Sequence, residues 1–332
     1  MSTSEKPVRF GIVGLGMGAG RSKTVPTTEG AQLVAVCDLL EERARPLAEE
    51  LGCEWTLKYD NLLARDDIDV IGVFTPSGWH CDFAIRALQA GKHAFTTKPM
   101  DIRVAKCDAA IEAAKKAGKV LAVDFQYRYD LVNHQILQAV QQGAFGRVFQ
   151  IDLRMKWYRG QDYYDGGSPP GWRSRKETEG GSVANQGVHY VDLMQWFGGP
   201  VRSILGWINT VGHKIETEDL SNSLWRFESG AWGSVVTTTC NTPGLGTIIE
   251  ISGDQGTVIW KNNKIELWKT ETGAKAEDFS APADLPAGII ADMVSAVRKG
   301  TKPYVDGPEG RKTVAIIEAV YRSAAEGKPV TL

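Results

Sequence analysis

The first 125 residues alternate between short apolar runs and helical stretches, and no other feature constrains the fold of this chain as strongly. Five apolar runs, bounded by glycine, proline or charged residues, occur at 8–14, 32–38, 69–76, 93–99 and 119–125. Continuous runs of this length are typical of strands buried on both faces of a parallel sheet. Stretches such as CDFAIRALQAGK connect them, so we predict strands that alternate with helices covering both faces. We therefore expect an α/β Rossmann-fold N-terminal domain.

The first apolar run ends in GLGMGAG, residues 14–20, which contains the pattern G-x-G-x-x-A. Glycines at such a turn let the backbone approach the pyrophosphate of a dinucleotide, whose charge the following helix N-terminus favours. Asp38 ends the second run 22 residues after Gly16, and an acid there binds a ribose 2′-hydroxyl and repels a 2′-phosphate. We therefore predict NAD as the cofactor, and NADP stays open because Arg43 lies nearby. The loop residues expected to contact the cofactor are Gly14, Gly16, Met17, Gly18 and Ala19.

Ligands bind a parallel sheet at the carboxyl ends of its strands, so residues that finish the predicted strands are candidate contacts. Lys98 ends one strand before a proline, and it is either a catalytic lysine in the nicotinamide crevice or a surface lysine beside a turn. His80 is either an ordinary first residue of a helix or a cofactor contact, and Arg21 is either a solvated cation or a phosphate contact. Further cofactor contacts at strand ends are expected from Thr75, Pro76 and Gln126.

The second half of the chain changes to strand-like runs separated by glycine and serine, which predicts antiparallel hairpins. These runs lie at 147–159, 201–211, 221–229, 230–240, 246–254 and 256–268. We predict an α+β C-terminal domain with a large, mostly antiparallel open sheet. The expected domains are residues 1–127, which bind the dinucleotide, and residues 128–332, which bind the substrate.

The segment NQGVHYVD, residues 185–192, places Asn185, His189 and Asp192 at spacings that stack side chains on one face of an α-helix. Histidine suits proton removal near neutral pH, so His189 is either a general base or a buried histidine bonded to a carbonyl. Asp192 either supports His189 or lies buried against the sheet. No metal is expected, because two ligands in an HxxD spacing are not diagnostic of zinc.

Three motifs occur in order: TPSGWH at 75–80, AIRALQAGKHAFTTKPM at 84–100, and the glycine pair followed by HxxD. Together they resemble the Gfo/Idh/MocA family of NAD(P)-dependent oxidoreductases (glucose-fructose oxidoreductase and inositol dehydrogenase), and the resemblance spans nearly the whole chain. It implies that Lys98 and His189 are the catalytic pair and that Asn185 occupies a third active-site position.

The resemblance has further implications and two departures. It implies that Trp172 and Arg173 contact the cofactor, and that a homodimer or homotetramer forms through the open face of the C-terminal sheet. Thr97 stands where the family usually has a glutamate, and Asn185 stands where an aspartate is frequent. Because an amide makes only neutral hydrogen bonds, Asn185 is expected to orient a sugar hydroxyl or the imidazole without stabilising its charge.

The stretch KWYRGQDYYDGGSPPGWRSR, residues 156–175, is rich in aromatic rings and cations, which suit sugar faces and hydroxyls. The alternative is packing of this loop against a neighbouring subunit. The residues expected to bind substrate, besides Lys98, Asn185 and His189, are Tyr127, Arg128, Tyr158, Arg159, Tyr163 and Tyr164.

Composition excludes several other classes of protein. A net charge of −2 gives no electrostatic footprint for nucleic acid or an anionic membrane, and no apolar run has the length of a membrane span. The polar N-terminus lacks the apolar core of a secretory signal, and five scattered cysteines without a CxxC pair indicate reduced thiols. We therefore expect a cytoplasmic protein with a small-molecule substrate.

These observations predict an NAD-dependent dehydrogenase that acts on a secondary hydroxyl of a sugar, glycoside, amino sugar or cyclitol. His189 would be the general base and Lys98 would assist it. One alternative is an enzyme that retains NAD and cleaves or rearranges a glycosidic bond by transient oxidation. The other alternative is a sugar- or NAD-sensing protein without catalysis.

Overall fold

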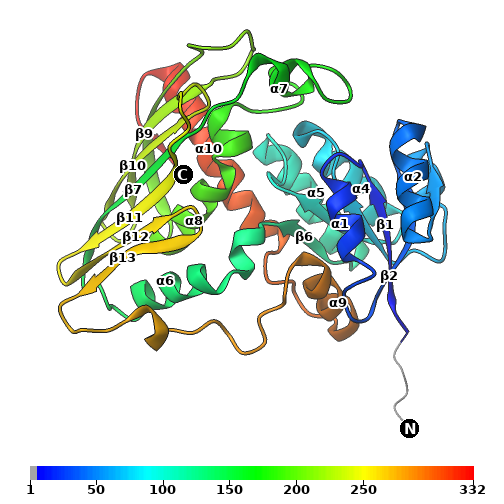
Figure 1. The fold of residues 1–332 in the computed structure, drawn as a ribbon, viewed down its shortest axis with the longest axis horizontal. Coiled ribbons are helices and arrows are strands. Elements are labelled where there is room, and N and C mark those ends of the chain that lie inside the picture. Colours follow the sequence, from blue (N-terminus) through cyan, green and yellow to red (C-terminus); the bar gives the residue numbers. More distant parts are fainter. Residues whose placement is uncertain (1–5) are drawn as a thin grey trace. The chain divides into compact units, whose positions relative to one another are not determined.

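The computed structural model describes residues 6–332, and its contacts divide the chain into two compact units. The first unit comprises residues 6–126 and Pro286–Arg311, and the second comprises Tyr127–Leu285 and Lys312–Leu332. Figure 1 labels the elements of both units. Among the residues that the structure describes, no helix is both long enough and apolar enough to cross a membrane.

The first unit contains a six-stranded sheet in the order β3-β2-β1-β4-β5-β6, and every strand pair in it is parallel. The strands are β1 (Val8–Val13), β2 (Ala31–Cys37), β3 (Glu54–Thr56), β4 (Val70–Val73), β5 (His93–Thr97) and β6 (Leu121–Asp124). The helices are α1 (Gly18–Thr24), α2 (Glu41–Leu51), α3 (Tyr59–Leu63), α4 (His80–Gln89), α5 (Val104–Ala117) and α9 (Ile289–Lys299). The predicted Rossmann fold is confirmed. Chain order reverses between β1 and β4, and a crevice for ligands is expected at the carboxyl ends of such neighbouring strands.

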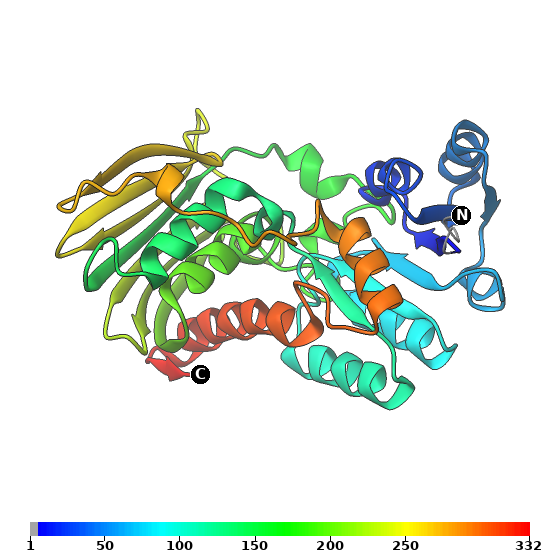
Figure 2. The same cartoon turned by 90° about the horizontal axis from the view of Figure 1, so that it is seen from below.

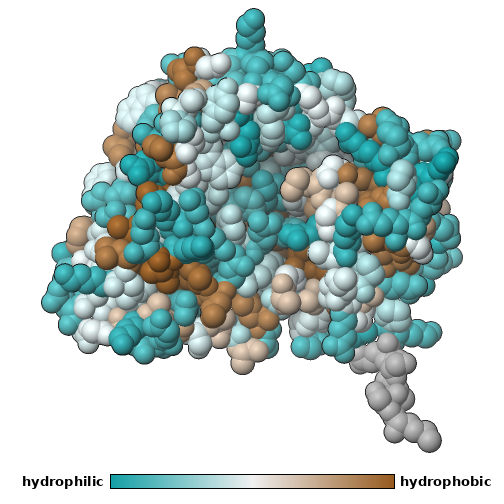
Figure 3. All heavy atoms as spheres, viewed as in Figure 1, coloured by the Kyte–Doolittle hydropathy of each residue, from teal (hydrophilic) through white to brown (hydrophobic). Residues whose placement is uncertain are grey.

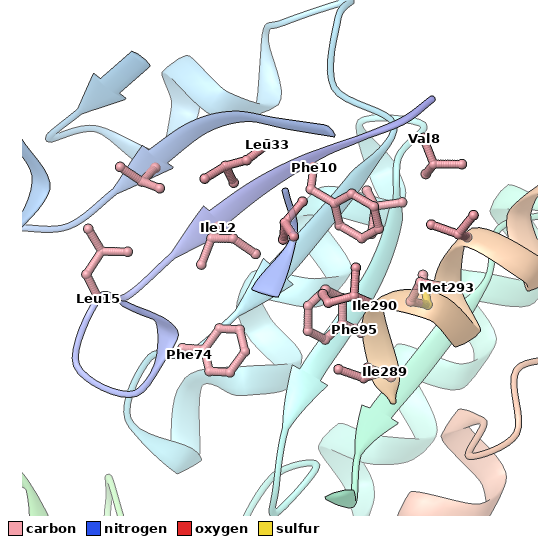
Figure 4. Packing of buried hydrophobic residues seen from close by; sticks show 14 of the residues in the cluster. Val8, Phe10, Ile12, Leu15, Leu33, Phe74, Phe95, Ile289, Ile290 and Met293 are labelled. Carbon is pink, nitrogen blue, oxygen red and sulfur yellow. The ribbon is translucent and has the colours of Figure 1, made fainter. Parts of the chain in front are cut away.

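The hydrophobic core of the first unit includes side chains from α9, far along the chain (Figure 4). Ile289, Ile290 and Met293 are at most 3% exposed and join a cluster that contains Phe10 and Phe95. The predicted second domain, residues 128–332, includes this helix, whereas the structure places it in the first unit. The apolar face of α9 is visible in the sequence, but nothing in the sequence states which sheet it covers.

The second unit contains an eight-stranded sheet in the order β13-β12-β11-β7-β10-β9-β8-β14. Only β7 and β10 pair in parallel, so the predicted, mostly antiparallel sheet is confirmed. Its strands are β7 (Val148–Lys156), β8 (Val201–Asn209), β9 (Leu220–Phe227), β10 (Trp232–Thr238), β11 (Gly246–Gly253), β12 (Gly256–Lys261), β13 (Lys264–Thr270) and β14 (Val330–Thr331). The helices α6 (Leu131–Gln141) and α8 (Val188–Gly198) lie along one face of this sheet (Figure 2).

The two faces of this sheet differ in exposure. Along β9 the side chains alternate, with Trp225 and Phe227 buried beneath the helices and Leu224 45% exposed on the other face. Trp207 and Trp232 lie on the same exposed face as Leu224 and are 54% and 52% exposed. On the side of this unit that is visible in Figure 3, hydrophobic residues lie between hydrophilic ones. The sheet therefore keeps large apolar side chains on its open face.

Candidate active site

The glycine-rich loop between β1 and α1 has the geometry of a phosphate cradle. Gly14 has a φ of +86°, and a Cβ there would lie 2.5 Å from the carbonyl oxygen of Phe74. A Cβ on Gly18 would contact the Phe74 side chain at 3.1 Å, so Gly18 lets the start of α1 pack closely on the end of β4. A Cβ on Gly16 would meet nothing within 4 Å, so its side of the turn is open. This arrangement fits a pyrophosphate that approaches the backbone at Gly16.

Asp38, at the end of β2, braces this loop. Its Oδ2 accepts a hydrogen bond from the Leu15 N–H at 2.6 Å, and its Oδ1 accepts one from the Leu40 N–H at 3.0 Å. A carboxylate has about four acceptor positions, so it can still accept bonds from ribose hydroxyls. Met17 and Leu39 beside it are 75% and 71% exposed, which offers apolar surface to an adenine ring. The residues present therefore fit an NAD molecule.

Arg21 in α1 forms an ion pair within the protein. The sequence had left two other roles open, a solvated cation or a phosphate contact. Its guanidinium binds both oxygens of Asp124 at the end of β6, at 2.5 and 3.0 Å. Burial raises the pKa of Asp124, and the charges of Arg21 and Lys98 act against that rise. Asp124 was not among the predicted site residues, although an acid that ends a buried strand at the ligand edge is a usable signal.

His80 joins two loops at the carboxyl edge of the sheet. It is 1% exposed, and its Nδ1 and Nε2 each lie 2.7 Å from a carbonyl oxygen, of Pro99 and Thr75 respectively. Burial lowers the pKa of His80 to about 4, although both carbonyl contacts act in the opposite direction. The predicted cofactor contact is therefore corrected: both ring nitrogens are directed at protein carbonyls, and the ring holds the loops after β4 and β5 together.

Lys98 follows β5 directly and lies at the same carboxyl edge, half-buried. Its positive charge lowers the pKa of both Asp124 and His80, which places it within electrostatic range of these two side chains. Thr75 and Pro76 follow β4 at this edge and precede the 3₁₀ turn η1 (Ser77–Trp79). The first unit thus collects the cradle, an acid and a lysine at the ends of its strands.

In the second unit, Asn185 and His189 do not share one regular helix. Asn185 lies in a π-helical turn, η4 (Ser182–Gln186), and His189 lies in the first turn of α8. The predicted stacking at α-helical spacing is therefore wrong at Asn185. Its Oδ1 accepts hydrogen bonds from the Gln186 amide at 2.7 Å and the Tyr163 hydroxyl at 3.3 Å. Gln186 also donates to the Tyr163 hydroxyl at 2.7 Å, which completes a small polar cluster.

The surroundings of His189 are aromatic on one side. Its ring centroid lies 5.1 Å from that of Tyr127 and 6.4 Å from that of Tyr190. Tyr127 lies in η2 (Gln126–Tyr129), the 3₁₀ turn that follows β6. The imidazole is half-buried.

Asp192 and Arg128 form a buried ion pair in the second unit. The guanidinium of Arg128 binds both carboxylate oxygens of Asp192, at 2.7 and 2.8 Å, and the two residues are 3% and 1% exposed. Thr313 donates a further hydrogen bond to Asp192 at 3.0 Å, and Arg128 stacks over Trp196. Asp192 therefore has the structural role, and the predicted substrate contact of Arg128 is corrected, because its charge is committed to Asp192.

The aromatic loop places two arginines against one tyrosine. The guanidinium groups of Arg159 and Arg173 lie 5.4 and 4.6 Å from the centre of the Tyr163 ring. Arg173 also lies 4.6 Å from the centre of the Trp172 ring, in η3 (Trp172–Ser174). Arg159 donates to the Gln186 side chain at 3.3 Å, so the loop reaches the polar cluster around Asn185.

Two other tyrosines of this loop behave differently. Tyr164, in α7 (Gln161–Asp165), is 4% exposed and its hydroxyl bonds to the Thr239 hydroxyl at 2.7 Å. The prediction that Tyr164 binds substrate is therefore wrong, since its ring is packed inside the unit. Tyr158 is 54% exposed.

Gln186 was not among the predicted site residues, although its position beside Asn185 is a usable signal.

One cluster has the composition of a metal site, made of His213, Asp219 and Cys240, whose ligand atoms lie within 4.8 Å of one another. Asp219 accepts hydrogen bonds from the backbone N–H groups of Val211, Gly212 and His213 and from the His213 ring. These bonds already use the acceptor positions of the carboxylate. The geometry is that of a braced hairpin connection.

Comparison with known proteins defines the class and then the family. Residues 8–125 match the model of an oxidoreductase family with an NAD-binding Rossmann fold, and residues 133–259 match the GFO/IDH/MocA C-terminal domain. The first unit is therefore an NAD-binding Rossmann domain of an oxidoreductase. The chain belongs to the GFO/IDH/MocA family.

Individual relatives cover nearly the whole chain. The WlbA dehydrogenase from Bordetella pertussis, solved in complex with NADH and UDP-GlcNAcA, is 32% identical, with a TM-score of 0.90 over 98% of this chain and 99% of that one. The D-apiose dehydrogenase of Paraburkholderia graminis is 26% identical over 92% of this chain and 84% of its own length. The scyllo-inositol 2-dehydrogenase (NAD(+)) of Bacillus subtilis is 26% identical over 99% and 97%.

Proposed function

We propose that this protein is an NAD-dependent dehydrogenase that transfers a hydride between a secondary hydroxyl of a sugar or cyclitol and nicotinamide. The observation that carries the proposal is the grouping of an open cradle at Gly16, Asp38 and Lys98 at one edge of the first sheet. The relatives support the substrate class, because they are named as dehydrogenases of apiose and inositol.

In this proposal NAD is held by the first unit. Asp38 binds the ribose hydroxyls and disfavours NADP, and the loop from Gly14 to Ala19 faces the pyrophosphate. When bound, nicotinamide supplies the site that accepts or donates the hydride. Further contacts within this unit are proposed at Thr75, Pro76 and Gln126, and the family resemblance adds Trp172 and Arg173 of the second unit.

The protein's own chemical task is to remove the hydroxyl proton as the hydride leaves. His189 takes that proton, because an imidazole is a good base near neutral pH. Lys98 donates a hydrogen bond to the reacting oxygen and stabilises the negative charge that develops there. Asn185, held by Gln186 and Tyr163, orients a neighbouring hydroxyl and adds no charge of its own.

The rings and cations near Asn185 and His189, together with the exposed Tyr158, form the sugar side of the proposed site. Tyr127, Tyr158 and Tyr163 offer apolar faces to a sugar ring, and Arg159 offers hydrogen-bond donors to its hydroxyls. We also propose a cytoplasmic homodimer or homotetramer that covers the open face of the second sheet. The exposed Trp207, Leu224 and Trp232, and five free thiols, support these two parts of the proposal.

The test is to incubate the protein with NAD or NADP and a panel of sugars, glycosides and cyclitols. Nicotinamide reduction is followed by absorbance, and NMR assigns the new carbonyl. NAD reduction that depends on the sugar supports the proposal. A purified protein that holds spectroscopically visible NAD(H) and converts a glycoside without net cofactor reduction points to the retained-cofactor mechanism. Binding without any conversion points to a sensor.

A further inference from the structure

The start of the π-helical turn that carries Asn185 is hydrogen-bonded to the buried residue Glu218. Glu218 lies just before β9 and is 2% exposed. Its Oε1 accepts hydrogen bonds from the Val183 N–H at 2.8 Å and the Ser182 hydroxyl at 3.2 Å. Its backbone carbonyl accepts the Ser182 N–H at 2.8 Å. Glu218 thus binds two consecutive backbone N–H groups at the start of the turn.

The backbone N–H of the preceding residue, Gly181, is held by Tyr321 from helix α10 (Gly307–Glu326). The Tyr321 hydroxyl donates to Oε2 of Glu218 at 3.0 Å and accepts the Gly181 N–H at 3.0 Å. The N–H groups at a helix start have no partners within the helix, so a carboxylate there satisfies them and complements the helix dipole. Glu218 and Tyr321 supply these partners from distant parts of the chain.

The turn is also seated tightly on Glu218. A Cβ on Gly181 would lie 1.6 Å from Oε2 of Glu218, and a Cβ on Gly180 would lie 2.2 Å from that of Ala184. At the other end of the turn, a Cβ on Gly187 would lie 2.9 Å from Cγ2 of Thr237. Since neither end has free space, a change in the hydrogen bonds of Glu218 reaches the backbone of the turn.

The pKa of the Glu218 carboxyl group lies near neutral pH. Burial raises the pKa of Glu218 to about 7, and its hydrogen bonds from Val183, Tyr321 and Ser182 oppose the rise. The titratable groups that interact with the charge of Glu218 are Tyr321 from α10 and Tyr164 from α7; Asp219 is its neighbour in the chain, and Glu179 lies within electrostatic range of Tyr321. None of these four is a cation. A proton on Oε2 turns that oxygen into a donor, so the Tyr321 hydroxyl loses its acceptor.

We propose that Glu218 is a positioning residue of the dehydrogenase reaction, which acts on Asn185 through the turn η4 (Ser182–Gln186). The inference rests on the function proposed above. The ionised carboxylate and the Tyr321 hydroxyl hold the turn so that the Asn185 side chain stands beside Tyr163 and Gln186. Protonation of Glu218 removes the acceptor of the Tyr321 hydroxyl proton, shifts the turn and weakens the sugar complex, and leaves the NAD-binding loop of the first unit unaffected.

The test compares KM for the sugar, kcat and the Kd for NADH in the wild type, E218Q and Y321F across the pH range around 7. In the wild type we expect KM for the sugar to rise as the pH falls below about 7. In E218Q we expect a KM raised about tenfold at all pH values, because the turn no longer senses pH, with the Kd for NADH unchanged. In Y321F the pH midpoint of KM moves upward, because the carboxylate loses a donor that favours its charged form.

The matched control is Y59F, which also removes one hydroxyl from a buried tyrosine. The Tyr59 hydroxyl donates to the Phe83 carbonyl at 2.9 Å in the first unit, so we expect the pH dependence of KM to stay as in the wild type. Unchanged KM and pH dependence in E218Q, even with a lowered melting temperature, would overturn the inference. So would a downward midpoint in Y321F, which decides the matter if E218Q fails to fold.

A second readout does not depend on turnover. The carboxyl carbon of Glu218, recognised in 13C-glutamate-labelled protein as the resonance absent from E218Q, should titrate near 7. The side-chain amide resonance of Asn185 should move with the same midpoint and stay still in E218Q. An Asn185 amide that ignores this titration overturns the inference. Failure of every sugar to reduce NAD would instead overturn the proposed function, whatever the two resonances do.

Discussion

The glycines of the cofactor loop differ in what a side chain at each would meet. Gly14 combines a left-handed backbone with a carbonyl oxygen 2.5 Å from the position of a Cβ. Gly16 has a backbone conformation that other residues can adopt, and a Cβ there would meet no atom within 4 Å. The first is therefore required by the fold of the loop, whereas the second keeps room for a ligand.

Single alanine substitutions separate these two roles. We expect Gly14→Ala to lower the free energy of unfolding by about 1–3 kcal/mol, because it adds backbone strain and a steric clash. Gly16→Ala should leave stability within about 0.5 kcal/mol and weaken NADH binding, because the methyl group occupies the cradle. Urea denaturation and NADH fluorescence titration measure the two effects. Equal NADH affinity in Gly16→Ala and the wild type would contradict the cradle.

Asp38 is predicted to determine the choice of cofactor. Asp38→Ala should raise the Kd for NADH about tenfold, since one charged hydrogen-bonding group to the ribose is lost. The ratio of NADPH to NADH affinity should rise, because the repulsion of a 2′-phosphate disappears. Asp38→Asn is the control, because it keeps an acceptor for the Leu15 N–H. An unchanged ratio in both variants would remove Asp38 from the ribose site.

The buried ion pair of Arg128 and Asp192 connects two elements of the second unit, η2 and α8. It holds the segment that carries Tyr127 against the helix that carries His189, whose rings lie 5.1 Å apart. Neither residue faces solvent. The pair therefore fixes how these elements pack.

Removing one partner of this ion pair should destabilise the fold more than replacing both partners with apolar residues. Arg128→Ala or Asp192→Ala should each lower the free energy of unfolding by about 3–5 kcal/mol, because each leaves a buried charge without its partner. Arg128→Met combined with Asp192→Leu should cost less than the sum of the two single losses. Chemical denaturation of the four proteins measures this coupling. Additive effects would show that the pair does not act as a unit.

How much the sequence predicts differs between elements. β1, β2, β4, β5 and β6 follow from continuous apolar runs, and the cradle follows from the order of its glycines. β3 was missed because it has three residues, of which Glu54 and Trp55 are exposed and give no apolar run. Short edge strands depend on their neighbours and carry little signal of their own.

The candidate site was predicted in part. Sequence spacing identified Asn185 and His189 but not the π-helical turn, because that turn depends on Glu218 and Tyr321, which are remote in the chain. Arg128 and Tyr164 have residue types that suit sugar binding, and only burial shows that they serve packing. Long-range partners of this kind are invisible to local patterns.

The stability of the molecule should depend on pH through Glu218. Its pKa is about 7 in the fold, against an ordinary value of 4.5, so the folded state binds this proton more tightly than the unfolded state. This favourable contribution is complete below pH 4.5 and is lost as the pH rises through 7. The total loss is on the order of 3 kcal/mol. Denaturation of the wild type and E218Q at several pH values should show the difference between them changing across this interval, and a constant difference would contradict it.

In the proposed reaction of the whole molecule, His189 takes the proton when a sugar hydroxyl is oxidised. The direct test is turnover of the active sugar by His189→Ala, together with its affinity for NADH. We predict that kcat falls about 10³-fold, because the general base is lost, while the Kd for NADH stays near that of the wild type. Retained turnover, or loss of NADH binding together with turnover, would contradict this account.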